Sequence, residues 1–156
     1  MTAPILRDYQ TTAVDHVELC IERGLRKILL VAPTGSGKTV IAGEIIRRHR
    51  AKLKSALFIA HRREIVAQTS DKLNDIDVAH GIIMAGTQPR DLEFVQVAAI
   101  QTLHARAIRS ERMPLPPADL IIIDEAHHCP AATYRAVIDA YPNTPIIGLT
   151  ATPMSW

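Results

Sequence analysis

The chain has 156 residues, of which 47% are hydrophobic and 22% charged, a composition typical of one globular domain rather than of a disordered or fibrous chain. Its 18 basic and 16 acidic residues leave a formal net charge of +2, too small to indicate a nucleic-acid partner by itself. Cys20 and Cys129 lie far apart, which argues against a zinc site or a disulfide framework. The sequence has no signal pattern and no long apolar run, so we expect a cytoplasmic protein without a membrane partner.

The predicted elements alternate between helices and strands. Helices are indicated where apolar residues recur three and four positions apart, as at Val14, Val17 and Ile21, and strands where short runs are almost entirely apolar. Such strands, separated by helices, predict an α/β fold with a mostly parallel sheet and helices on both faces, formed by residues 1–156 as a single domain. The expected elements are, in chain order, a helix over about 9–23, a strand over 27–32, a helix over 39–50, a strand over 55–60, a helix over 63–74, strands over 78–84 and 95–100, a short helix over 102–109, a strand over 120–123, a helix over 131–141 and a strand over 146–149.

A glycine-rich segment joins the first predicted strand to the helix that follows it. Residues 32–39 read Ala-Pro-Thr-Gly-Ser-Gly-Lys-Thr, which is the P-loop pattern except that Ala32 stands where the first glycine is usually found. Backbone N–H groups of such a loop bind phosphates at a helix N-terminus, while Lys38 can reach the outer phosphates and the Thr39 hydroxyl can bind Mg²⁺. We therefore predict an ATP–Mg²⁺ site in which the phosphates are bound by Thr34, Gly35, Ser36, Gly37, Lys38 and Thr39.

Basic residues gather in two places, over 47–54 and over 61–63. The first cluster ends a predicted helix, where cations interact favourably with the helix dipole, so we interpret it as a solvated helix end. The second cluster follows the strand over 55–60, at the edge of the sheet where ligands bind in such folds.

Two other predicted strands end in polar residues at the same edge. The strand over 120–123 runs into Asp124-Glu125-Ala126-His127, and the last strand runs into Thr150-Ala151-Thr152-Pro153. Asp124 can hold the Mg²⁺ and Glu125 can activate a water for attack on the outer phosphate. A helix cap for the acids and a hydroxyl turn for the threonines are the alternatives, and the glycine-rich loop on the same sheet favours the functional interpretation of both.

The order of these segments carries a family resemblance. The segments are Leu-Arg-Asp-Tyr-Gln at 6–10, the loop at 32–39, Phe-Ile-Ala-His-Arg at 58–62, Ala-Ile-Gln-Thr-Leu at 99–103, Asp-Glu-Ala-His at 124–127 and Gly-Leu-Thr-Ala-Thr-Pro at 148–153. In this order they resemble superfamily 2 helicases, and most closely the branch that contains XPB-type DNA helicases and the motor subunits of type I and type III restriction enzymes. The resemblance covers essentially the whole chain and implies a RecA-like P-loop NTPase domain, the first motor domain of a DNA helicase or translocase.

The resemblance also implies roles in the nucleotide site. Gln10 matches the glutamine that reads the adenine edge. This role suits a side-chain amide, because an amide can donate and accept hydrogen bonds at once. Arg7 is expected to pack near the base. A polar residue that merely starts a helix is the alternative for Gln10. Lys38 and Glu125 match the catalytic lysine and the base that orients the attacking water, and Thr39 and Asp124 match the Mg²⁺ ligands.

For nucleic acid, the resemblance implies contacts with the phosphate backbone that carry no sequence specificity. Arg62, Gln101 and Thr102 are the expected contacts, and for Arg63 we expect a solvated side chain instead. An aromatic content of 4% gives little support for base stacking. Coupling between the nucleotide and the nucleic acid is expected at His127, Thr150 and Thr152. For His127, a histidine that merely starts a helix is an equal alternative. We assign no role to His128 and Cys129.

Motors of this superfamily also use a second RecA-like domain, in cis or in trans, that supplies an arginine finger. Only three residues follow Pro153, so we expect this chain alone to hydrolyse ATP weakly or not at all. The alternative function is a catalytically silent nucleotide- and DNA-binding module. An unrelated P-loop enzyme such as a small-molecule kinase would leave Gln10, Gln101 and Thr102 unexplained.

Overall fold

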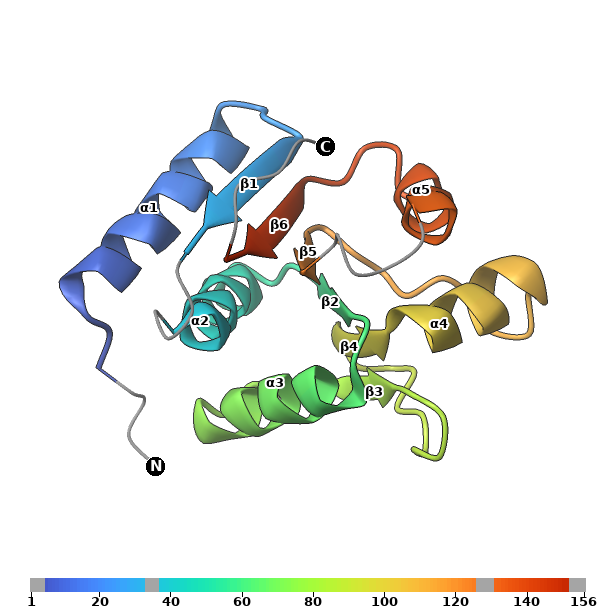
Figure 1. The fold of residues 1–156 in the computed structure, drawn as a ribbon. Coiled ribbons are helices and arrows are strands. Elements are labelled where there is room, and N and C mark those ends of the chain that lie inside the picture. The colour runs from blue at the N-terminus through green and yellow to red at the C-terminus, as the bar shows by residue number, and fades with distance from the viewer. Residues whose placement is uncertain (1–4, 33–36, 126–130, 152–156) are drawn as a thin grey trace.

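The computed structural model describes residues 5–32, 37–125 and 131–151. These residues form a six-stranded sheet with the strand order β1-β6-β5-β2-β4-β3, in which every neighbouring pair is parallel (Figure 1). The predicted α/β fold with a parallel sheet is therefore confirmed. The elements are α1 (Asp8–Glu22), β1 (Lys27–Val31), α2 (Lys38–Ala51), β2 (Ala56–Ala60), α3 (Arg63–Asp75), β3 (Gly81–Ile83), β4 (Val95–Ala99), α4 (Ile100–Leu103), the π-helix η1 (His104–Arg109), β5 (Ile121–Asp124), α5 (Ala131–Asp139) and β6 (Ile146–Thr150).

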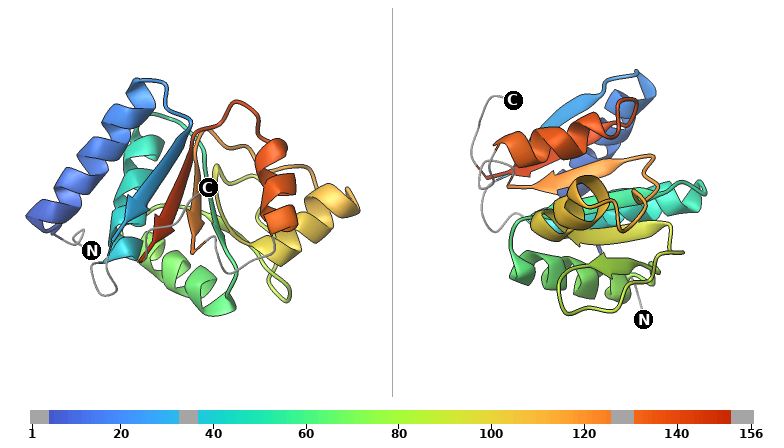
Figure 2. Two further views of the ribbon diagram at one scale, coloured as in Figure 1. Left: turned by 45° about the horizontal axis from the view of Figure 1, so that its top comes forward. Right: turned by 90° about the vertical axis from the view of Figure 1, so that its right-hand side faces the viewer.

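Helices cover both faces of the sheet (Figure 2). On one face, α1, α2 and α3 pack their apolar residues against the sheet, with Val14, Ile45 and Leu73 among those fully buried. On the other face, α4, η1 and α5 do the same. Every residue of β2, β4, β5 and β6 is buried as a result, which explains their near-continuous apolar sequences.

Two predicted elements differ from the structure. The third strand is limited to Gly81–Ile83 because His80 is buried and hydrogen-bonded before the strand begins, through Nδ1 to the Val78 carbonyl at 2.8 Å and through Nε2 to the Ser70 hydroxyl at 2.7 Å. The helix predicted over 102–109 is instead the short α4 followed by the π-helix η1. Its wider turn is closed by the Ser110 N–H, which donates to the Ala105 carbonyl at 3.1 Å.

The interpretation of the basic cluster over 47–54 as a solvated helix end is wrong for two of its members. Arg48 is held by carboxylates of α1 and α2, and His49 is buried with 5% of its surface exposed. Burial lowers the pKa of His49, and the nearby Lys54 and Lys52 act in the same direction. The periodicity of the helix was predicted correctly, but the helix that packs beside it could not be seen in this local pattern.

A close approach between β3 and β4 requires a glycine. A Cβ atom at Gly81 would lie 2.4 Å from Oε1 of Gln96 and 2.8 Å from the Arg90 carbonyl oxygen. The Gln96 side chain cannot move aside freely, because its Nε2 donates to the carbonyls of Arg90 and Glu93 at 2.8 and 3.2 Å. These bonds fasten the chain segment that leads into β4.

We therefore expect Gly81→Ala to lower the free energy of unfolding by about 1–3 kcal/mol, the usual cost of forcing an extra methyl group into a packed site. The measurement is urea denaturation followed by circular dichroism. Gly43→Ala is the matched control, since a Cβ there would meet only side-chain carbons of Ile76 and Lys72, at 3.4 and 3.6 Å, and alanine favours a helix. Equal midpoints for the Gly81 variant and the unaltered protein would contradict the contact.

Candidate nucleotide-binding site

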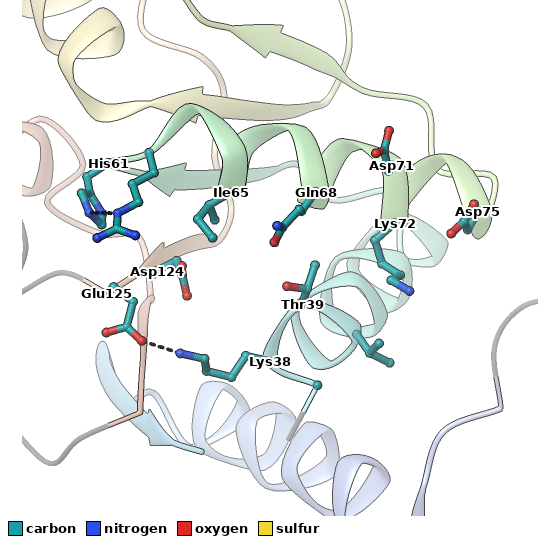
Figure 3. A pocket seen from close by; sticks show the side chains of 13 residues that line it. Lys38, Thr39, His61, Ile65, Gln68, Asp71, Lys72, Asp75, Asp124 and Glu125 are labelled. Carbon is teal, nitrogen blue, oxygen red and sulfur yellow. Dashed lines mark hydrogen bonds and ion pairs between the residues drawn. The ribbon is translucent and has the colours of Figure 1, made fainter. Parts of the chain in front are cut away.

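A cavity of about 740 Å³ opens at the carboxyl edge of the sheet (Figure 3). It is lined by the first turn of α2, the end of β5, the residues after β2 and one side of α3. This is the edge at which ligands bind in parallel α/β folds. Of the predicted site residues, the cavity brings together Gly37, Lys38, Thr39, Arg62, Asp124 and Glu125.

The last described residue of the glycine-rich loop has a backbone that favours glycine. Gly37 has φ of +79° and directly precedes α2. A Cβ atom there would lie 2.4 Å from Nε2 of Gln10, so the start of α1 is in close contact with the loop. The arrangement leaves Lys38 and Thr39 in the first helical turn, where both line the cavity.

Lys38 and Glu125 meet across the cavity. The Lys38 ammonium donates a hydrogen bond to the Glu125 carboxylate, which also accepts from the Ala151 N–H at 3.3 Å. The Glu125 backbone has φ of +50° and its N–H donates to the Leu149 carbonyl at 2.9 Å. These contacts fix the residue after β5 against the end of β6 and direct its carboxylate towards Lys38.

Thr39 and Asp124 offer oxygen ligands to the same cavity. Asp124 is the last residue of β5 and only 7% of its surface is exposed. No group of three histidine, cysteine or acidic side chains that could enclose a metal occurs in the part of the chain that the structure describes. Two protein oxygens nevertheless suit Mg²⁺, which is commonly bound by one or two side chains together with phosphate oxygens and water.

Gln10 lies at the first turn of α1 and is buried. Its side-chain oxygen accepts from the Arg7 N–H at 2.9 Å, and its own N–H donates to the Arg7 carbonyl at 2.9 Å. The amide thus has a structural role in starting the helix, which was the alternative at the sequence level. It also lies against Gly37, directly before α2. Arg7 is exposed and directly precedes α1.

The expected nucleic-acid residues lie beside the cavity, at the ends of β2 and β4. The Arg62 Nε contacts Nε2 of His61 at 3.2 Å, and the Gln101 Nε2 donates to the His61 carbonyl at 3.2 Å. Thr102 is half-buried in α4. Arg63 was expected to be only solvated; it is exposed, but its guanidinium also donates to the Ala85 carbonyl at 3.0 Å.

Of the remaining predicted residues, the structure describes only Thr150. Thr150 ends β6 and is buried, and its carbonyl accepts from the Ala32 N–H at 2.9 Å, so it joins the last strand to the residue that follows β1. The remaining predictions lie outside the described residues, namely those for Thr34, Gly35, Ser36, His127 and Thr152, together with the unassigned His128 and Cys129.

One wall of the cavity was missed at the sequence level. It is formed by the side of α3 that carries Gln68, Asp71, Lys72 and Asp75. These residues recur at spacings of three and four, which is one helix face. The sequence pattern shows a polar stripe, but nothing in it indicates that the stripe faces the first turn of α2 across a cavity rather than open solvent.

Comparisons with known proteins decide the family. The family described as "Type III restriction enzyme, res subunit" matches residues 4–155. The chain belongs to this family. The "Putative ATP-dependent helicase IRC3" of Saccharomyces cerevisiae is 37% identical over 97% of this chain, and the "DNA 3'-5' translocase XPB2" of Sulfurisphaera tokodaii is 31% identical over 95% of it. The chain spans 24% and 31% of these two relatives, respectively.

Solved structures share this fold. The helicase domain of Hef from Pyrococcus furiosus has 27% identity and a TM-score of 0.76, over 97% of this chain and 34% of that one. The Sulfolobus solfataricus SWI2/SNF2 ATPase core, solved in complex with double-stranded DNA, has a TM-score of 0.75 over 97% of this chain and 33% of that one, and its 18% identity supports the fold alone. The resemblance to superfamily 2 helicases and the RecA-like fold are both confirmed.

Among the described residues, no helix is long and apolar enough to cross a membrane.

Proposed function

We propose that this domain binds ATP and Mg²⁺ at the carboxyl edge of its sheet and forms the ATP-hydrolysing part of a superfamily 2 DNA motor. One observation carries the proposal: Lys38 and Thr39 of α2 share a cavity with Asp124 and Glu125, which lie 85 or more residues later in the chain. A cation, two oxygen ligands and a carboxylate are the groups that phosphoryl transfer requires.

Each group has a separate task. Lys38 binds the outer phosphates. Glu125, which is hydrogen-bonded to Lys38 in this structure, then contacts the attacking water instead and accepts its proton. Thr39 and Asp124 hold Mg²⁺, which neutralises phosphate charge when it is bound. Gln10 reads the adenine edge with its amide, an acceptor for the amino group and a donor for a ring nitrogen, and Arg7 packs near the base.

Nucleic acid is proposed to bind beside this site through its phosphate backbone. Arg62, Gln101 and Thr102 follow β2 and β4, two neighbouring strands, so their side chains share one edge of the sheet. His127, Thr150 and Thr152 are proposed to couple this edge to the nucleotide. DNA is favoured because one relative is named a DNA translocase and a structural neighbour was solved with double-stranded DNA.

A second RecA-like domain, in cis or in trans, is proposed to complete the motor. The support is the length of the relatives, of which this chain spans about a quarter to a third. Closure of two domains over the nucleotide would then couple hydrolysis to movement along the DNA.

The proposed DNA contact predicts a salt-dependent affinity that is independent of sequence. Arg62→Ala should reduce the slope of log K against log salt concentration by about one, because one phosphate contact is lost. The measurement is fluorescence anisotropy with labelled single-stranded DNA between 50 and 200 mM salt, roughly the range over which phosphate contacts are resolved. Arg23→Ala is the control, since Arg23 caps the end of α1 away from the cavity. An unaltered slope in the Arg62 variant would contradict the contact.

A further inference from the structure

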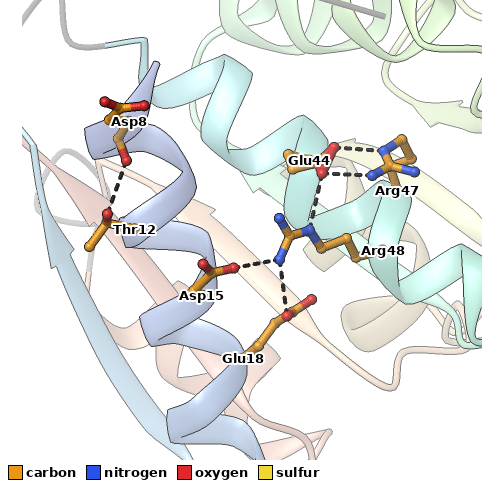
Figure 4. A network of polar contacts seen from close by, with 7 residues as sticks. All are labelled: Asp8, Thr12, Asp15, Glu18, Glu44, Arg47 and Arg48. Atoms are coloured by element: carbon orange, nitrogen blue, oxygen red, sulfur yellow. Dashed lines mark hydrogen bonds and ion pairs between the residues drawn. The ribbon is translucent and has the colours of Figure 1, made fainter. Parts of the chain in front are cut away.

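A single arginine joins the helix that carries Gln10 to the helix that begins with Lys38 (Figure 4). From α2, the Arg48 Nη1 donates to Asp15 Oδ1 at 2.8 Å and to Glu18 Oε2 at 3.1 Å, both on α1. Its Nε donates to Glu44 Oε2 at 3.0 Å on its own helix. The planar guanidinium therefore fixes two helices with bonds of defined direction.

The neighbouring Arg47 bonds within its own helix instead. Its guanidinium donates to Glu44, with Nε to Oε1 at 2.6 Å and Nη2 to Oε2 at 2.7 Å, so both partners lie on α2. The hydrogen bond from Arg47, aided by that from Arg48, lowers the pKa of Glu44, so the network stays charged at neutral pH. Two adjacent arginines of one helix thus differ in whether they reach α1.

The position of α1 over α2 is set by apolar packing and by two further points of contact. Val14 and Val17 of α1 are buried in the core, but apolar packing alone has no preferred direction and tolerates small shifts. At its first turn α1 meets the phosphate loop, where Gln10 lies against Gly37. The network of Arg48 lies further along both helices, so these two points of attachment together fix the translation and the rotation of α1.

We propose that Arg48 is a positioning residue of the nucleotide site, which holds α1 in register with α2 and thereby keeps the Gln10 amide in place for the base. The proposal rests on the adenine role of Gln10 given above. A merely structural arginine would affect thermal stability, whereas a positioning residue must also affect the preference for adenine over guanine, because guanine presents an acceptor where adenine presents a donor.

The test compares the dissociation constants of ATP and GTP, both with Mg²⁺, by isothermal titration calorimetry. Arg48→Ala should lower the preference for ATP by about three- to tenfold, the size of effect expected when a positioning contact of a binding site is lost. The double variant Asp15→Asn/Glu18→Gln removes the same bridge from the α1 side and should lower the preference equally. Combining it with Arg48→Ala should add nothing.

Arg47→Ala is the matched control, because it removes an arginine and its two hydrogen bonds to Glu44 without touching α1. Its preference should stay within about twofold of the unaltered protein. Gln10→Ala tests the underlying role. An unaltered preference in Gln10→Ala would overturn the adenine role and the positioning role together. A lowered preference in Gln10→Ala with an unaltered one in Arg48→Ala and in the double variant would overturn the positioning role alone.

Discussion

ATP binding is expected to be lost in Lys38→Ala. Lys38 is the cation of the first turn of α2 that projects into the cavity, and it must meet several phosphate charges at once. Hydrogen bonds to charged groups contribute about 1.5–3 kcal/mol each, so the affinity should fall by at least roughly 100-fold, which removes binding at ordinary concentrations. Isothermal titration calorimetry with ATP and Mg²⁺ measures the effect.

Lys72→Ala is the matched control for this variant. Lys72 lines the same cavity from α3, so its removal takes one positive charge from the cavity without touching the phosphate loop. Its ATP affinity should change by no more than about threefold, as expected for a solvated charge at some distance. If Lys38→Ala bound ATP as tightly as the unaltered protein, the assignment of the phosphate site would be wrong.

The core of the site was predictable because it follows from two local patterns and one rule of topology. The loop at 32–39 and the acidic pair after an apolar strand are short motifs, and parallel strands present their carboxyl ends at one edge. The amino-acid sequence therefore suffices to place Lys38, Thr39, Asp124 and Glu125 together. The buried strands were equally visible, because a sheet covered on both faces needs near-continuous apolar residues.

The contacts that were missed join segments far apart in the sequence through side chains of common types. Arg48 and Asp15 are separated by 33 positions, and only the packing of α1 beside α2 makes them neighbours. The contact of Gln10 with Gly37 likewise depends on how the first turn of one helix meets a loop. Local periodicity predicts which face of a helix is polar, but it does not say which polar face meets another helix.

Glu125→Gln should strengthen the binding of ATP. Glutamine retains an oxygen that can accept from the Ala151 N–H, so the turn after β5 should persist. The charge that holds Lys38 is lost, and Lys38 becomes available to phosphate. ATP should therefore bind about two- to fivefold more tightly, the size expected of a partly exposed ion pair. Asp75→Asn, which removes a carboxylate from the far wall of the same cavity, should leave the affinity unaltered.

Hydrolysis by these 156 residues on their own is expected to stay close to background. The chain supplies Lys38, the proposed Mg²⁺ ligands and Glu125, whereas the superfamily resemblance implies an arginine from a second domain. Loss of such an arginine costs about 10³–10⁵ in rate, which is roughly 4–7 kcal/mol of barrier. Single-stranded DNA should stimulate the chain little, because stimulation requires two domains to close over the nucleotide.

Glu125→Gln should then change the slow turnover of this chain very little, yet strongly disable a longer protein in which the site is complete. The reason is that a base contributes its full effect only when the charge of the transferring phosphoryl group is also stabilised. A steady-state ATPase assay with and without single-stranded DNA measures both variants. Robust DNA-stimulated turnover of the 156-residue chain, abolished by Glu125→Gln, would instead show that an arginine of this chain, or of a second copy of it, completes the site.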